Sequence, residues 1–180
     1  METKYESINN ELENLSSYLN DHLKDGKNIL LRFDSKGVNM FYVADSSDYY
    51  SRVGYYRDEL NAQRIDSLCR LAGLDIEAFE HIRKTLKDIG CISANTHFPD
   101  YCDFGYKRVN LVTYSFRLLT DYAPKETMNR FIEDEECIPY DDKCLFLFQG
   151  GVAGPQAWDY EVKRRYMESR HWEEIYNTQE

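Results

Sequence analysis

Two apolar runs separated by a four-residue turn constrain the fold of this chain more than any other feature. Residues 28–33 and 38–44 are mostly apolar, and the sequence between them is Asp34-Ser35-Lys36-Gly37. A short turn that ends in glycine typically joins two neighbouring antiparallel strands. The sequence therefore predicts a β-hairpin here, and with it an antiparallel sheet.

Further strand candidates follow this hairpin along the chain. Residues 106–121 form a long candidate in which alternate side chains would face opposite sides of a sheet. Residues 91–97 and 143–149 are shorter candidates, and residues 98–105 are predicted to turn. Residues 45–58 are rich in Ser, Asp and Tyr, so they are predicted to form an ordered loop or an irregular strand.

Helical periodicity marks both ends of the chain and three segments between them. Ile8, Leu12, Leu15 and Leu19 recur at three- and four-residue steps, which predicts an N-terminal helix of about five turns ending near Gly26. The other predicted helices cover residues 65–72, 75–89, 124–132 and 158–176. This order predicts an α+β fold with residues 1–180 as a single domain. An antiparallel sheet of hairpin-connected strands would carry amphipathic helices, including long N-terminal and C-terminal helices.

Charge and cysteine content restrict the compartment and the partner. The chain has 22 Lys and Arg against 32 Asp and Glu, a formal net charge of −10. Such a surface repels the phosphate backbone, so nucleic acid is not the expected partner, whereas a basic protein surface would be attracted. The five cysteines have no disulfide-like spacing, and the sequence shows no signal-peptide pattern. No apolar run is longer than residues 144–148. These features predict a cytoplasmic protein that does not enter membranes.

One candidate interaction surface combines tyrosines with acids. The candidate partner-binding residues are Asp45, Asp48, Tyr49, Tyr50, Tyr55, Tyr56, Glu133 and Glu135. Tyrosine offers rigid aromatic contact area with a polar tip, and carboxylates attract a cationic partner. The alternative is that the tyrosines pack against the edge of the sheet and that the acids are simply solvated.

Residues 62–119 resemble a winged helix-turn-helix domain in the order of their elements. Two short helices meet at Gly73, and Gly90 is followed by two strand candidates. The resemblance implies DNA binding through the second helix, yet that helix begins with Asp75 and Glu77, where recognition helices present cationic or base-reading groups. Such a regulator would also need a basic stripe, for which the candidates are Arg83, Lys84, Lys87, Lys107 and Arg108. Two ordinary core helices beside a sheet are the simpler interpretation.

Two further patterns contain residue types that bind metals. Cys91, His97 and Cys102 are zinc-binding types, but a structural zinc site needs four ligands, so buried thiols and a loop histidine are the simpler explanation. Pro99-Asp100 and Asp141-Asp142-Lys143 resemble the pattern of nucleases that bind Mg²⁺ through carboxylates. In a chain with 32 acids, turn residues explain this second pattern more simply.

Three functions stay open at this point. The first is a non-enzymatic cytoplasmic binding protein, of the inhibitor or immunity type, that covers a basic site on a partner protein. The second is a small enzyme without a readable motif, in which a Cys or His would share a pocket with a carboxylate or with Arg117. The third is the winged-helix-like regulator. No catalytic residue, cofactor or metal is predicted, and the sequence leaves the oligomeric state open.

Overall fold

The predicted hairpin is present and belongs to a larger antiparallel sheet. Its strands pair from Lys27 opposite Asp45 to Asp34 opposite Gly37. Gly37 has a φ of +112°, a conformation that favours glycine, and it ends the turn as the sequence predicts. The structure is a computed structural model, and it describes residues 1–109, 112–123, 125–133, 137–149 and 160–169.

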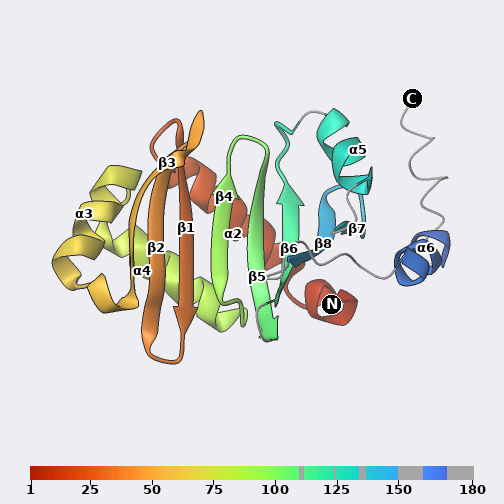
Figure 1. Ribbon diagram of the computed structural model, residues 1–180, viewed down its shortest axis with the longest axis horizontal. Coiled ribbons are helices and arrows are strands. Elements are labelled where there is room, and N and C mark those ends of the chain that lie inside the picture. The colour runs from red at the N-terminus through yellow and green to blue at the C-terminus, as the bar shows by residue number, and fades with distance from the viewer. Residues whose placement is uncertain (110–111, 124, 134–136, 150–159, 170–180) are drawn as a thin grey trace.

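The described residues form an α+β fold with eight strands in one open sheet and six α-helices. In chain order the elements are α1 (Glu2–Glu6), α2 (Asn9–His22), β1 (Lys27–Asp34), β2 (Gly37–Asp45), β3 (Asp48–Tyr56), the 3-10 turn η1 (Arg57–Glu59), α3 (Ala62–Ala72), α4 (Ile76–Asp88), β4 (Ser93–His97), β5 (Tyr101–Val109), β6 (Val112–Leu119), α5 (Lys125–Glu133), β7 (Cys137–Pro139), β8 (Cys144–Gln149) and α6 (Tyr160–Ser169). Across the sheet the strand order is β3-β2-β1-β4-β5-β6-β8-β7, and each neighbouring pair is antiparallel (Figure 1).

One face of the sheet, the helix face, carries the main core. A single row of paired residues crosses all eight strands on this face: Tyr55, Phe41, Leu31, Ala94, Phe104, Phe116, Phe146 and Ile138. Helices α2 and α4 run behind the strands in Figure 1, and α2 buries Leu12, Leu15 and Leu19 in the same cluster. Burial of each such side chain contributes about 1.5–3 kcal/mol, so this layer is the main source of cohesion between helices and sheet.

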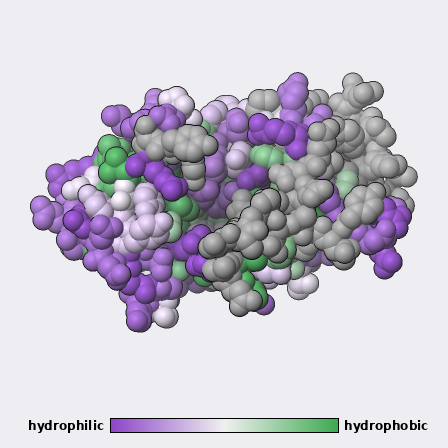
Figure 2. Space-filling model, in the orientation of Figure 1, coloured by the Kyte–Doolittle hydropathy of each residue, from purple (hydrophilic) through white to green (hydrophobic). Residues whose placement is uncertain are grey.

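The opposite face, the second face, carries a more mixed and more polar set of side chains. The neighbouring row on this face is Tyr56, Met40, Arg32, Ser93, Gly105, Ser115, Leu147 and Cys137. Helix α5 covers one end of it, where Phe131 packs with Cys137 and Leu147. Figure 2 shows that the described surface on this side is largely hydrophilic, with small hydrophobic areas.

The single long N-terminal helix of the sequence-based prediction is corrected by the structure to two helices. Helix α1 ends at Glu6, Ile8 leaves the helical conformation with a φ of −140°, and α2 ends well before Gly26. The break allows Tyr5 to pack against the ring of Phe116, with the ring centroids 5.7 Å apart. Of the predicted long C-terminal helix, the structure describes α6, and the remainder lies outside the described residues.

The single long strand predicted over residues 106–121 is wrong, because β5 ends at Val109 and β6 begins at Val112. The turn predicted over residues 98–105 is also shorter than expected. Gly105 belongs to β5, where a Cβ would collide with the Ser93 hydroxyl, so this glycine permits close packing within the sheet. Residues 45–58 contribute β3, a regular edge strand apart from one irregularity in its register.

The two predicted central helices are confirmed together with their end signals. The Asp75 carboxylate accepts a hydrogen bond from the Ala78 N–H at 2.7 Å and caps α4. Gly73 ends α3 with a φ of +85°. Local signals of this kind place both helices because the capping interactions lie within a few residues.

Candidate functional site

A cleft of about 380 Å³ lies between α2 and the turns that follow β6 and β7. Its lining residues are Glu13, Ser16, Ser17, Asn20, Asp21, Leu118, Leu119, Thr120, Asp121, Tyr122 and Lys143. The volume suits a small ligand or a single inserted side chain. The lining is mainly polar, which favours a polar or charged occupant over an apolar one.

Helix α2 provides one wall of this cleft. Its five lining residues follow at three- and four-residue steps from Glu13 to Asp21, so they form one stripe along the helix. This polar stripe lies beside the apolar stripe of Leu12, Leu15 and Leu19, which is buried against the sheet. The periodicity that predicts the apolar stripe also marks this polar stripe, although the residues of the polar stripe were not among the predicted site residues.

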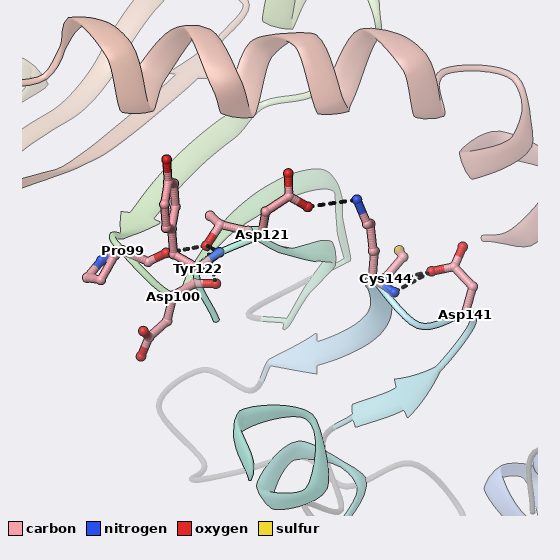
Figure 3. A network of polar contacts seen from close by, with 8 residues as sticks. Pro99, Asp100, Asp121, Tyr122, Asp141 and Cys144 are labelled. Carbon is pink, nitrogen blue, oxygen red and sulfur yellow. Dashed lines mark hydrogen bonds and ion pairs between the residues drawn. The ribbon is translucent and has the colours of Figure 1, made fainter. Parts of the chain in front are cut away.

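Hydrogen bonds around Thr120 fix the opposite wall. The Thr120 hydroxyl donates to the carbonyl of Pro99, and the Thr120 N–H donates to the carbonyl of Asp100 at 3.0 Å. The same hydroxyl oxygen accepts from the Tyr122 N–H at 3.3 Å. These bonds tie the turn after β6 to the turn between β4 and β5, and Figure 3 shows the Tyr122 ring directed toward the helix above it.

An ion pair lies at the mouth of the cleft. The Lys143 ammonium donates to the Asp121 carboxylate at 2.9 Å, and both side chains are more than half exposed (Figure 3). The hydrogen bond and the charge of Asp121, with a smaller contribution from Glu13, raise the pKa of Lys143, so this amine is cationic. Three carboxylates of the lining, those of Glu13, Asp21 and Asp121, therefore outnumber one ammonium.

The nuclease-like pattern proves to be turn structure at the same place. The Asp141 carboxylate accepts from the backbone N–H groups of Lys143 and Cys144, at 2.9 and 2.7 Å, and so shapes the turn between β7 and β8. In Figure 3 the Asp100 carboxylate points away from Asp141 and from the Asp121 ion pair. Within the described part of the chain, no group of three or more His, Cys, Asp or Glu side chains is placed to hold a metal ion.

The structure separates the residues predicted to form a tyrosine-rich acidic surface. Asp45 and Asp48 lie at the turn between β2 and β3, where Asp45 pairs with Lys27 at 2.5 Å. Tyr55 and Tyr56 lie at the far end of β3, about 24 Å away along the strand.

The two tyrosines of this set whose side chains are described, Tyr55 and Tyr56, face opposite ways. Tyr55 packs against the main core beneath the guanidinium of Arg64, 4.4 Å from the ring centroid, whereas Tyr56 lies on the second face and is 53% exposed. Tyr55 therefore fits the alternative interpretation given above, in which the tyrosines pack against the edge of the sheet.

The other predicted surface residues belong to the opposite sheet edge or lie outside the description. Glu133 ends α5 beside β7, and β3 and β7 are the two edges of the sheet, about 30 Å apart. Tyr49 and Tyr50 belong to β3, but their side chains, like that of Glu133, lie outside the described part of the structure. Glu135 lies outside the described residues altogether.

Arg117, a candidate for the pocket of an enzyme, forms a buried ion pair on the second face. Its guanidinium donates to both carboxylate oxygens of Asp103, at 2.7 and 2.9 Å, and its Cζ lies 4.1 and 4.2 Å from the ring centroids of Tyr101 and Phe131. Burial alone lowers the pKa of Arg117, but the charge and hydrogen bonds of Asp103 outweigh it and raise the pKa. His97 stacks on Tyr101, and burial lowers its pKa.

Four of the cysteine thiols are held in their unreactive protonated form. All five cysteines are buried, and none of them forms a disulfide. Burial raises the pKa of Cys69 to about 11 and that of Cys91 to about 12, and it raises the pKa values of Cys102 and Cys144 well above the ordinary thiol value. Because the thiolate is the nucleophile, these thiols are poor candidates for covalent catalysis.

The winged-helix-like segment differs from a wing in the placement of its strands. β4, β5 and β6 lie in the interior of the eight-stranded sheet, whereas a wing projects toward DNA. On α4 the guanidinium of Arg83 pairs with Glu80, and both side chains are about half exposed.

Comparison with known proteins identifies no relative. No protein-family model matches the chain, and no curated protein or solved structure matches it significantly. None of the described helices is both long and apolar enough to span a bilayer. Any functional conclusion therefore depends on the chemistry of the sites above.

Proposed function

We propose that this chain is a non-catalytic binding protein that receives a cationic group of a protein partner in the cleft beside α2. The observation that carries the proposal is the excess of carboxylates in a cleft of about 380 Å³, where Glu13, Asp21 and Asp121 face one lysine. A lysine or arginine side chain entering the cleft would find hydrogen-bond acceptors and an opposite net charge.

The charge of the whole chain supports the same kind of partner. A net charge of −10 speeds the diffusional approach of a basic protein, and this attraction weakens as salt is added. An inhibitor or immunity-type protein that acts in the cytoplasm and covers a basic site would use this combination. We favour the cleft over the tyrosine-rich β3 as the binding surface, because the cleft gathers its carboxylates in one place.

Binding is favoured over catalysis by the composition of the cleft. Its described lining contains neither histidine nor cysteine. Lys143 is kept cationic by Asp121 and so is a poor general base near neutral pH. The remaining groups are suited to holding a charged ligand by hydrogen bonds and ion pairs.

A nuclear magnetic resonance titration with a defined probe tests the proposal. Acetyl-arginine methylamide is added to the ¹⁵N-labelled full chain, with the uncharged isostere acetyl-citrulline methylamide as the control. The arginine probe is expected to shift the amide signals of residues 13–21 and 118–122, and the citrulline probe is not. Equal shifts with both probes, or arginine-dependent shifts confined to other regions, would contradict the proposal.

Charge variants of the chain provide the matched comparison. Asp121→Asn is expected to weaken binding of the arginine probe by about two- to fivefold, the usual effect of one exposed charge pair. Glu80→Gln removes a half-exposed carboxylate on α4, outside the lining of the cleft, and is expected to leave binding unchanged. Equal losses in the two variants would indicate a general effect of net charge.

A further inference from the structure

The wall of the cleft opposite α2 presents an aromatic ring to solvent. Tyr122 lines the cleft and is 73% exposed, and in Figure 3 its ring points toward the helix above it. The Ala123 N–H donates to the Thr120 carbonyl at 3.1 Å and closes a tight turn, so Asp121 and Tyr122 occupy its two central positions. A ring and a carboxylate on consecutive residues therefore lie at the mouth of the cleft.

The turn that carries this ring is held in place by hydrogen bonds within the chain. The Thr120 hydroxyl and N–H donate to the carbonyls of Pro99 and Asp100. The Tyr122 N–H in turn donates to the Thr120 hydroxyl oxygen at 3.3 Å. Because the backbone that carries the ring is already ordered, a ligand that contacts the ring costs little further conformational entropy.

The carboxylate next to the ring can accept a further hydrogen bond. Lys143 donates to Oδ1 of Asp121 at 2.9 Å. This bond uses one of the two carboxylate oxygens, and the Asp121 side chain is 82% exposed, so Oδ2 can accept from a group that enters the cleft. A ligand at this point would meet the flat surface of an aromatic ring and an anionic acceptor together.

An arginine of this chain already uses a tyrosine ring and a carboxylate together. The Cζ atom of Arg117 lies 4.1 Å from the ring centroid of Tyr101, while the same guanidinium donates two hydrogen bonds to Asp103. The guanidinium of Arg64 lies over the ring of Tyr55 in a similar way, at 4.4 Å. A guanidinium is planar and weakly hydrated, so it can stack on a ring and still donate at its edges. The compact ammonium of lysine holds its water more strongly.

We propose that the group received by the cleft is an arginine side chain of the partner, which stacks on the Tyr122 ring and pairs with Asp121. This inference rests on the function proposed above, and it narrows the cationic group of the partner from lysine or arginine to arginine. The carboxylates of Glu13 and Asp21 attract either cation. Tyr122 is then the residue that determines specificity, because its ring distinguishes a guanidinium from an ammonium.

Nuclear magnetic resonance titration of the full chain with three probes tests this inference. The probes are acetyl-arginine methylamide, acetyl-lysine methylamide with an unmodified side-chain amine, and the uncharged acetyl-citrulline methylamide. The arginine probe is expected to bind about two- to fivefold more tightly than the lysine probe, the usual effect of one exposed contact between a cation and a ring. Its Cδ protons are expected to shift upfield on binding, because protons above the face of an aromatic ring are shielded.

Three variants assign this preference to the ring. Tyr122→Ser removes the ring and is expected to make the affinities for the arginine and lysine probes equal and to abolish the upfield shift. Tyr122→Phe keeps the ring without its hydroxyl and is expected to preserve both effects. Tyr56→Ser is the matched control, because Tyr56 is another exposed tyrosine, at 53%, outside the lining of the cleft, and it is expected to change neither effect.

The three probes also separate the failure of this inference from the failure of the proposed function. If the two cationic probes bind equally well and both bind better than citrulline, the cleft receives cations but Tyr122 does not select arginine. The same conclusion holds if Tyr122→Ser weakens the arginine and lysine probes by the same factor. If neither cationic probe binds better than citrulline, the proposed function and this inference are both overturned.

Discussion

The ion pair between Arg117 and Asp103 offers the sharpest test of how the second face is held together. Both side chains are less than 10% exposed, at 7% and 4%, and the two groups share two hydrogen bonds. Arg117→Leu leaves the Asp103 carboxylate buried without a partner. Loss of one partner of such a pair costs about 3–5 kcal/mol, a large fraction of the 5–15 kcal/mol by which typical domains are stable.

The double variant separates the unpaired charge from lost packing. Asp103→Leu with Arg117→Leu removes both charges, so it is expected to be more stable than Arg117→Leu alone by about 2 kcal/mol. Arg83→Leu, which breaks the exposed pair with Glu80, is expected to cost only about 0.5 kcal/mol.

Urea unfolding followed by circular dichroism measures five chains: the wild type, these three variants and the single variant Asp103→Leu. The comparison holds when the dependence of the unfolding free energy on urea is the same in each chain, since that slope reports the surface exposed on unfolding. The reasoning fails if Arg117→Leu costs less than about 1 kcal/mol, or if the double variant loses the sum of the two single losses.

Two further predictions follow from the buried titratable groups. Because burial raises the pKa values of Cys69 and Cys91 to about 11 and about 12, a thiol reagent at pH 8 is expected to modify them far more slowly in the native chain than in urea, and rapid native labelling would contradict this. Burial lowers the pKa of His97 in the native chain. As the pH drops below about 6.5, the unfolded chain therefore binds a proton at this histidine more readily than the native chain does, and the free energy of unfolding is expected to fall. His97→Gln should flatten this decline, as measured by urea unfolding between pH 5 and 8, and an unchanged pH profile in the variant would refute the assignment.

The elements that the sequence predicts correctly are those with signals close together in the chain. The hairpin turn before Gly37 and the caps at Gly73 and Asp75 each depend on interactions that span a few residues. Propensity and capping are local effects, so a single sequence contains the information that they require.

The errors arise where a residue responds to a distant strand. Gly105 favours a turn when the sequence is considered alone, but in the structure it faces Ser93 of β4 at a point where a side chain would not fit. The break before α2 lets Tyr5 reach Phe116, more than 100 residues later in the chain. Neither contact has a signature within a sequence window.

The cleft is a product of strand order and could not be predicted from spacing. Its walls come from residues 13–21, 118–122 and 143, which meet because β8 lies beside β6 and α2 packs beneath β6. The predicted surface residues failed to gather for the same reason. Tyr55 and Tyr56 are neighbours on β3, but because they are consecutive in a strand their side chains lie on opposite faces of the sheet.

The unequal edges of the sheet limit how copies of this chain can assemble. Among the residues that the structure describes, β3 at one edge offers nine residues, including the exposed side chains of Val53 and Tyr56, whereas β7 at the other edge has three. Backbone pairing with another chain requires a strand of useful length, and very short edge strands discourage it. Pairing of β3 with β3 of a second copy would use the long edge of both chains and would leave only the short described β7 edges for further strand addition.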